Sequence, residues 1–279
     1  MNAWQRWAKP SRLGTYGILV AFAVVALFPI WWIVATSLET ASRAYSFPGA
    51  LVPQGVVSNY VTAWGLAPWT GFLLNSVLIS ATTAIGTVIV ALLAAYALVH
   101  LVGPRVSSLL FTAIIATLMV PFYAVMIPDY VIVRDLGWLN TYTAQIVPFL
   151  GGGFAVFLFR QFIKAFPGEL KEAAVMDGVG DLGFLWRILV PNLRPAMATV
   201  AIYTFILSWN AFLWPLIVTS TPSVQPVQVG LADLLSTANG TDFTVLAASA
   251  AITAFPIVVL YFFMHRQITE SISRTGLKG

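Results

Sequence analysis

The chain has 279 residues, of which 59% are hydrophobic and only 9% are charged. Soluble domains are nearer ~45 to 50% apolar and ~25% charged, so this composition excludes a large soluble fold and predicts a membrane protein. The net charge of +4 rests on 14 Lys and Arg residues, which argues against a nucleic-acid-binding surface. The absence of Cys excludes disulfides, thiolate metal sites and a cysteine nucleophile.

Six apolar stretches follow one another along the chain, each long enough to cross ~30 Å of hydrocarbon. We predict membrane-spanning helices at about 15–37, 72–98, 107–128, 141–159, 197–220 and 244–264. The first stretch is too long for a signal peptide and is expected to be retained. Pro121 and Pro128 interrupt the third stretch, so we expect kinks there. The sequence predicts an all-α polytopic membrane protein with a single transmembrane domain over residues 1–279.

The basic residues lie almost entirely on one side of this arrangement. With the N-terminus in the cytoplasm, the inner segments hold twelve Lys and Arg residues, whereas the outer segments hold only Arg43 and Arg134. Cytoplasmic loops of membrane proteins carry such an excess of Lys and Arg. We therefore predict that both termini and the long loop at 160–195 face the cytoplasm.

The predicted spans contain no Asp, Glu, Lys or Arg. Proton-coupled carriers need titratable groups inside the membrane, so proton coupling is disfavoured and the energy for transport is expected to come from outside the chain. An intramembrane enzyme would need converging catalytic groups, and we predict none. His100 and His265 are far apart in the sequence, and two lone His residues do not predict a metal site.

The inner loop at 160–195 holds nine charged residues and is predicted to form two short helices. Pro167 opens the first helix, acidic residues occupy its early turns, and Gly178 can adopt the left-handed conformation that ends a helix. Asp181 is placed to cap the second helix, at 182–190, which is expected to end at the proline that follows it.

Small residues beside an acidic one give the first of these helices a face that a partner can approach closely. Ala173 and Ala174 leave a shallow surface beside Glu172, which suits docking into a cleft. The spaced pattern around this face is EAA-x2-DG-x9-I-x2-P-x3-P, formed by Glu172, Ala173, Ala174, Asp177, Gly178, Ile188, Pro191 and Pro195. This pattern resembles the EAA loop of permease subunits in binding-protein-dependent ABC importers. The resemblance implies that the loop couples the chain to a separate ATPase subunit.

The resemblance extends over nearly the whole chain. Further similar segments are 57–60, 75–76, 94–97, 119–121, 136–141, 208–216, 229–231 and 276–279. Together they look like the smaller, six-span permease of maltose-type, carbohydrate-importing ABC transporters, with a type I importer fold. The chain departs from similar permeases at Ala211, where an acid is frequent, and at Asp129, where an apolar residue is usual. These departures weaken the inference about the substrate but leave the loop untouched.

The resemblance implies half of an importer in a bacterial or archaeal cytoplasmic (inner) membrane. The implied partners are a second permease subunit, two ATP-binding subunits, an extracytoplasmic solute-binding protein and the lipid bilayer, with no nucleic acid. ATP and Mg would bind to the ATPase, and this chain would hold no cofactor. The expected solute is a sugar or sugar derivative. Two alternatives stay open: a self-sufficient secondary carrier or channel, and an ABC importer permease for a non-carbohydrate solute.

Polar and amphipathic residues at or within the spans are candidates for the translocation path. A neutral hydroxylated solute needs amide and hydroxyl partners and aromatic faces, which are supplied by Asn75, Gln145, Tyr203, Ser208, Trp209 and Asn210. Hydrogen bonds between packed helices explain the same residues equally well.

The outer segment at 221–243 is longer than a simple link between two helices requires. Its Pro and Gly residues argue against one continuous helix, but 231–235 is predicted to form a short one. In the permeases that this chain resembles, the segment reaches towards the binding protein, which makes Leu231, Asp233, Ser236 and Asn239 candidate contacts. A cap that seals the outer mouth of the helix bundle is the alternative.

Overall fold

The computed structural model describes residues 12–46, 51–237 and 242–276, and no strand occurs among them. The all-α fold predicted from the sequence is therefore confirmed. The chain divides into two compact units, one built from Met1–Ala67 and Leu234–Ala254 and the other from Pro68–Asp233 and Phe255–Gly279.

The first unit contains α1 (Arg12–Ser37), α2 (Ala41–Ala44), α3 (Ser58–Leu66) and the beginning of α14 (Phe243–Gly276). Asn59 and Tyr60 of α3 hold the end of α1: the Asn59 amide donates to the carbonyl of Ser37 at 2.9 Å, and the Tyr60 hydroxyl lies 2.7 Å from Ser37 Oγ. Ala63 packs against Val245 and Ala248 of α14 in a small apolar cluster.

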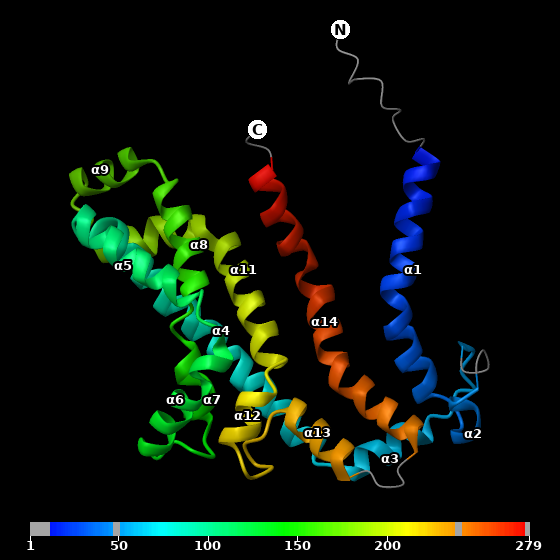
Figure 1. Cartoon of the computed structure of the whole chain (residues 1–279). Coiled ribbons are helices and arrows are strands. Elements are labelled where there is room, and N and C mark those ends of the chain that lie inside the picture. Colours follow the sequence, from blue (N-terminus) through cyan, green and yellow to red (C-terminus); the bar gives the residue numbers. More distant parts are fainter. Residues whose placement is uncertain (1–11, 47–50, 238–241, 277–279) are drawn as a thin grey trace. The chain divides into compact units, whose positions relative to one another are not determined.

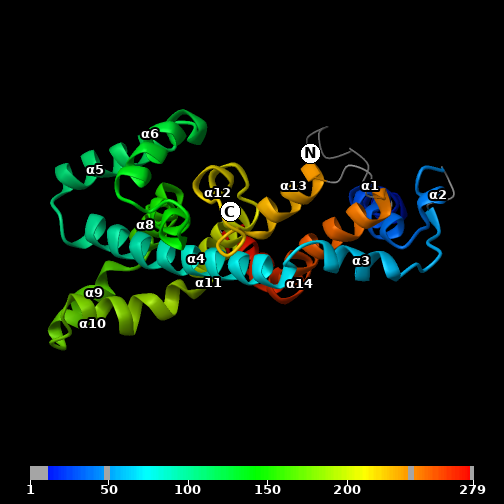
Figure 2. The ribbon, with the colours of Figure 1, turned by 90° about the horizontal axis from the view of Figure 1, so that it is seen from below.

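The second unit is organised around one long helix, α4 (Trp69–His100). The other helices are α5 (Pro104–Thr117), α6 (Phe122–Asp135), α7 (Tyr142–Ile146), η3 (Val147–Phe149), α8 (Gly153–Lys164), α9 (Gly168–Met176), α10 (Asp181–Gly183), η4 (Phe184–Leu189), α11 (Val190–Trp209), α12 (Leu213–Val218), α13 (Val227–Thr237) as far as Asp233, and the rest of α14. Helix α4 packs along α8 and α11 (Figures 1 and 2). Ala91 and Ala95 are fully buried there, because small side chains let helices approach closely.

Three helices of the described part of the chain are long and apolar enough to cross a membrane alone: Gly14–Ser37, Trp69–His100 and Phe243–Leu260. Two helix pairs pass the same test only together, Pro104–Thr117 with Phe122–Asp135 and Tyr142–Phe149 with Gly153–Lys164. By length and composition this gives three spans, or up to five if each bent pair is one span. The total of six spans stays a prediction.

The third predicted stretch, 107–128, is not continuous. Helices α5 and α6 meet at a bend of 99° and α6 runs on to Asp135. Pro121 precedes α6 and has extended backbone, with φ −62° and ψ 135°. Helix α5 does not continue into α6, because a proline has no N–H to donate to the preceding turn and disfavours helical backbone at the residue before it. Pro128 lies inside α6 without ending it.

The fifth predicted stretch, 197–220, is divided into α11 and α12. The Asn210 side chain donates to the carbonyl of Ile206 at 2.8 Å and ends α11. Pro215 would clash with the carbonyl of Ala211 in a continuous helix, but it fits in the first turn of α12. The break follows from these local preferences.

Candidate functional site

Helix α9 carries the EAA pattern and has defined ends. It follows Pro167, whose backbone lies at φ −58° and ψ 124°. It ends where Gly178 adopts φ +75° and where the N–H of Val179 donates to the carbonyl of Ala174 at 2.8 Å. The left-handed conformation predicted for Gly178 is confirmed. A side chain there would have open space around it but a strained backbone.

The limits predicted for the loop, 160–195, are wider than the non-helical segment in the structure. Helix α8 continues to Lys164, so Arg160 is part of that helix. Arg160 is buried, and its guanidinium lies 3.8 Å from the centre of the Phe111 ring. Arg160 was therefore wrongly taken as the start of the loop. It lies within α8, and the Phe111 ring and the surrounding helices cover its charged side chain.

The two alanines of the EAA pattern lie in different surroundings. Glu172 and Ala173 are exposed, but Ala174 is only 4% exposed and packs into the apolar core with Phe184 and Leu185. The expected shallow face of two alanines is therefore wrong, since successive helix residues point about 100° apart. In the second half of α9 the exposed residues are instead Glu172, Ala173, Val175 and Met176.

Asp181 does not cap the second helix. Gly180 is the N-cap of α10 and Asp181 is its first residue. The carboxylate Oδ1 instead accepts a hydrogen bond from the Tyr96 hydroxyl at 2.7 Å and lies 3.1 Å from Lys171 Nζ. The Asp181 carboxylate thus binds donors on α4 and α9, and Gly180 occupies the N-cap position.

The second helix of the loop also does not end at Pro191. Helices α10, η4 and α11 follow one another without a break from Asp181 to Trp209. The η4 turn is a π-helix, whose wider hydrogen-bonding pattern tolerates a following proline, and Asn192 Nδ2 donates to the carbonyl of Ile188 at 2.7 Å. Ile188 is half-buried and Pro191 is exposed in this continuous helix.

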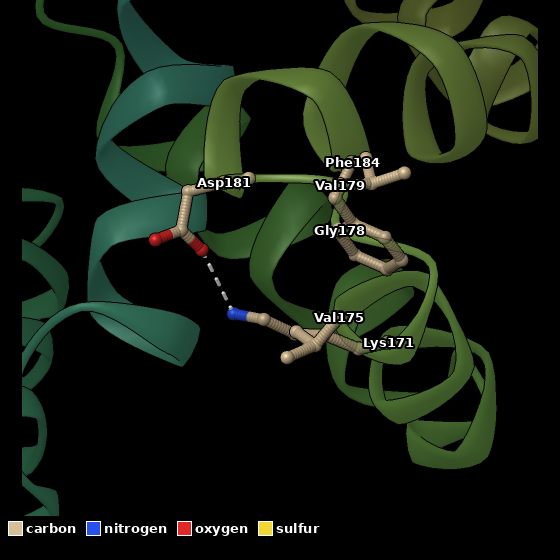
Figure 3. A pocket seen from close by; sticks show the side chains of 7 residues that line it. Lys171, Val175, Gly178, Val179, Asp181 and Phe184 are labelled. Carbon is tan, nitrogen blue, oxygen red and sulfur yellow. Dashed lines mark ion pairs between the residues drawn. The ribbon is translucent and has the colours of Figure 1, made fainter.

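A hollow of about 280 Å³ lies at the turn between α9 and α10 (Figure 3). Its lining consists of Lys171, Val175, Gly178, Val179, Gly180, Asp181 and Phe184. The Lys171 and Asp181 side chains point towards one another across it, as Figure 3 shows. Hydrogen bonds from Tyr96 and from Lys171 lower the pKa of Asp181 below its ordinary value, so the carboxylate is charged at neutral pH.

Two of the translocation-path candidates, Asn75 and Gln145, are buried and bind backbone. Asn75 Nδ2 donates to the carbonyls of Ser223 at 3.0 Å and Gln225 at 2.9 Å, and its Oδ1 accepts from the Tyr142 hydroxyl at 2.7 Å. Gln145 Nε2 donates to the carbonyl of Val224 at 3.0 Å. Both amides therefore hold the segment 223–225.

The other four candidates lie near the end of α11. Trp209 is buried and stacks on Phe205 with ring centres 5.9 Å apart. Tyr203 is 46% exposed, Ser208 is half-buried and Asn210 is exposed. The six candidates thus fall into two groups, one at the segment 223–225 and one along α11.

Asn140 is a polar anchor of the outer segment that was not predicted from the sequence. Its φ is +60°, a value that Asn tolerates better than most residues. Its Oδ1 accepts from the N–H groups of Ser220 at 2.9 Å and Thr221 at 3.1 Å, and from Thr221 Oγ1 at 3.1 Å. An Asn directly before the N-cap Thr141 of α7 was the local signal for this turn.

The short helix predicted at 231–235 is confirmed and is longer than expected, since α13 spans Val227–Thr237. Leu231 is half-buried, whereas Asp233 and Ser236 are exposed. Asn239, the fourth candidate contact with a binding protein, lies outside the described residues. Gly230 of α13 faces the ring of Phe72 with no room for a side chain.

Long apolar helices and bent helix pairs that pass the same test together indicate a polytopic helical membrane protein. Residues 87–274 match the family described as the binding-protein-dependent transport system inner membrane component. The chain belongs to this family, as the EAA pattern had indicated.

Individual relatives cover almost the full chain. It is 33% identical over 269 residues, 91% of this chain and 93% of the relative, to the sn-glycerol-3-phosphate transport system permease protein UgpE of Yersinia pestis bv. Antiqua. It is 31% identical over 281 residues, 97% of this chain and 99% of the relative, to the arabinooligosaccharides transport system permease protein AraQ of Halalkalibacterium halodurans.

A solved structure shares the fold. A chain from the crystal structure of a bacterial ABC transporter involved in the import of the acidic polysaccharide alginate superposes with a TM-score of 0.80 at 23% identity, covering 93% of this chain and 98% of that chain. The predicted type I ABC importer permease fold is therefore confirmed. The protein is a permease component of an ABC importer, which is a transport subunit in the inner membrane.

Proposed function

We propose that this permease forms half of the translocation path of an ATP-driven importer for a sugar or sugar derivative, and that α9 couples it to a separate ATPase subunit. The observation that carries the proposal is α9 itself, a short helix closed by a left-handed glycine, with its acidic and apolar residues exposed. The transported compounds in the names of the relatives, sn-glycerol-3-phosphate and arabinooligosaccharides, are both hydroxylated and support a polyhydroxylated solute.

The surface of α9 suits a protein partner. Val175 and Met176 are 60% and 87% exposed although the loop around them is charged. Exposed apolar side chains within polar surroundings are typical of interaction sites. Ala173 adds no bulk beside Glu172, so a partner can approach the helix closely. We assign this surface to one of two ATP-binding subunits, which would bind ATP and Mg, while the chain itself needs no cofactor.

The remaining partners would be a second permease subunit and an extracytoplasmic solute-binding protein. The exposed residues of α13, Asp233 and Ser236, are the proposed contacts with the binding protein. Asn75 of α4 and Gln145 of α7 bind the segment before α13, so the start of α13 would follow these helices.

The experiment that tests this function is purification of the assembled complex through a tag on this chain, followed by reconstitution in vesicles. We expect uptake that requires both ATP and the binding protein, and a sugar or sugar derivative that co-purifies with the complex. Uptake by the chain alone without ATP would indicate a carrier or channel. A co-purifying solute without sugar chemistry would contradict the assignment of the substrate class.

The proposed orientation has both termini and α9 in the cytoplasm. Because the chain has no Cys, single cysteines are specific probes. Ala173→Cys is a better cytoplasmic probe than Ala174→Cys, because Ala174 is buried. In intact cells a membrane-impermeant thiol reagent should label Ser236→Cys and spare Ala173→Cys. The reverse labelling would contradict this orientation.

A further inference from the structure

Near the end of α4, side chains from two helices meet on one carboxylate oxygen of a third. The Tyr96 hydroxyl donates to Asp181 Oδ1 at 2.7 Å, and Lys171 Nζ lies 3.1 Å from the same atom. Lys171 Nζ also lies 5.4 Å from the centre of the Tyr96 ring, within the range of a cation–π interaction. We call Tyr96, Lys171 and Asp181 the Asp181 joint. It connects α4, α9 and α10.

The Asp181 joint matters because α9 has little other attachment to the fold. Among the nine residues of α9, Ala174 is the buried one. Tyr96, by contrast, is 3% exposed, and its ring lies 4.9 Å from the His100 ring, which in turn packs edge-on against Phe184 at 6.0 Å. The hydroxyl of Tyr96 therefore has a fixed position. A displacement of α9 must either move α4 or break the joint.

The outer half of the same helix is attached to another segment. Asn75 binds the carbonyls of Ser223 and Gln225, and Ser76 Oγ accepts from the N–H of Val227 at 2.8 Å. Val227 is the first residue of α13. Helix α4 is uninterrupted between these contacts and Tyr96, a distance of about 30 Å at ~1.5 Å per residue.

We propose that α4 is a rigid rod that carries a displacement of α9 to the outer segment 223–227, and that the Asp181 joint is its connection to α9. This inference rests on the proposed function, since it is the ATPase that would move α9. When α9 moves, Lys171 and Asp181 move Tyr96 and with it α4. Asn75 and Ser76 then shift the start of α13. Tyr96 is thus a positioning residue that acts through Asp181.

The test compares Tyr96→Phe, which removes one hydroxyl and keeps the buried ring, with Tyr123→Phe, which removes an exposed hydroxyl on α6. Both are placed in a chain with Ser223→Cys, whose exposed side chain reports on the segment held by α4. In reconstituted complexes ATP should change the rate at which an impermeant thiol reagent labels this cysteine. Tyr96→Phe should reduce that change, and the solute transported per ATP, about threefold to tenfold. Tyr123→Phe should leave both unchanged.

A second variant from the α9 side keeps the test independent of any packing change at Tyr96. Lys171→Met removes the ion pair from a side chain that is 23% exposed. It should give the same loss of coupling, and the double variant should be no worse than either single one, because one joint is broken in every case. The proposal would be overturned if both single variants kept the wild-type change in Ser223→Cys labelling and the wild-type amount of solute transported per ATP. It would also be overturned if the losses of the two single variants added up in the double variant. Failure of ATP-dependent uptake in the wild-type complex would instead refute the proposed function.

Discussion

Among the glycines of the described residues, Gly230 has the least room for a side chain, so Gly230→Ala is a direct test of the packing between α13 and α4. A Cβ at Gly230 would overlap Cδ2 and Cε2 of Phe72 and would lie 2.9 Å from its Cγ. The Phe72 ring is 4% exposed and packs edge-on against Trp69 with ring centres 6.3 Å apart. Because the ring is buried, either the ring or α13 must shift to admit the added methyl group.

The expected change is a balance of two effects. Overpacking a buried contact costs about 1 to 3 kcal/mol, whereas replacing Gly by Ala inside a helix returns about 1 kcal/mol. The net loss is about 1 kcal/mol, which corresponds to a decrease in Tm of about 2 to 4 °C for a chain of this size. Gly71→Ala on α4 is the matched control, because no atom lies within 4 Å of its Cβ. It should keep or raise the Tm.

The assay is thermal unfolding of the purified complex in detergent, with Phe72→Leu as the second variant of a double-mutant cycle. The smaller side chain relieves the overlap, so the double variant should be more stable than the sum of the single effects predicts, by at least about 0.5 kcal/mol. Binding-protein stimulation of ATP hydrolysis should fall in Gly230→Ala while basal hydrolysis stays. Equal Tm values for Gly230→Ala and Gly71→Ala would show that Gly230 is not tightly packed. Additive effects of Gly230→Ala and Phe72→Leu would show that the added methyl group does not meet the Phe72 ring.

Three further substitutions test other parts of the candidate sites. Gly178→Val places a β-branched residue at φ +75°, so uptake should fall although the permease still reaches the membrane. The control Gly180→Ala, at φ −72°, should be tolerated. Normal uptake by Gly178→Val would contradict the coupling role. Asn140→Ala removes three hydrogen bonds to residues 220–221 and should destabilise the complex by about 2 to 3 kcal/mol in thermal unfolding; an unchanged Tm would contradict the anchoring. Because the pKa of Asp181 is lowered in the folded protein, its ion pair persists above the ordinary value of 3.8 and is lost only as the pH falls through the lowered pKa. Asp181→Asn should therefore reduce uptake by the same factor from about pH 5.5 to 8, and a defect that disappears towards pH 5.5 would show that the wild-type carboxyl is already protonated there.

Features that depend on a single residue and its neighbours in sequence were predictable. Gly178 was placed correctly because a left-handed helix end strongly favours glycine. The division of the fifth apolar stretch had a weaker signal in Pro215, because proline is favoured in the first turn of a helix and disfavoured in its interior. Apolar length alone gave no reason to break the stretch, which is why it was predicted as one span.

Features that depend on partners distant in sequence were not predictable. The Tyr96 hydroxyl that binds Asp181 lies 85 residues away, and the carbonyl of Ser223 lies 148 residues from Asn75. Asp181 was therefore assigned to the local role for which its position qualifies it, an N-cap. Ala174 was placed on the docking surface for the same reason, since only the tertiary packing shows which of two adjacent alanines faces the core.

The broken helices explain several of the polar side chains inside this permease. A helix that ends within a membrane leaves backbone carbonyls without partners, and water is not available to replace them. Trp214 Nε1 donates to the carbonyl of Ala144 in the short α7 at 2.9 Å, and Thr87 Oγ1 donates to that of Phe149, where η3 ends, at 3.2 Å.

Asn75 and Gln145 bind carbonyls of the non-helical segment 223–225 in the same way, so their side-chain N–H groups have a structural use that does not require a solute. Tyr203 on α11 and Asn210 directly after it differ because both residues are exposed, although the Asn210 amide also donates to the carbonyl of Ile206. The Tyr203 ring packs on Phe154 with centres 5.0 Å apart, and 46% of the residue stays accessible. Among the polar candidates for the path, an aromatic face and an exposed amide are what a hydroxylated solute would contact. Substitutions on this part of α11 are therefore expected to change solute selectivity, whereas those at Asn75 and Gln145 are expected to change stability.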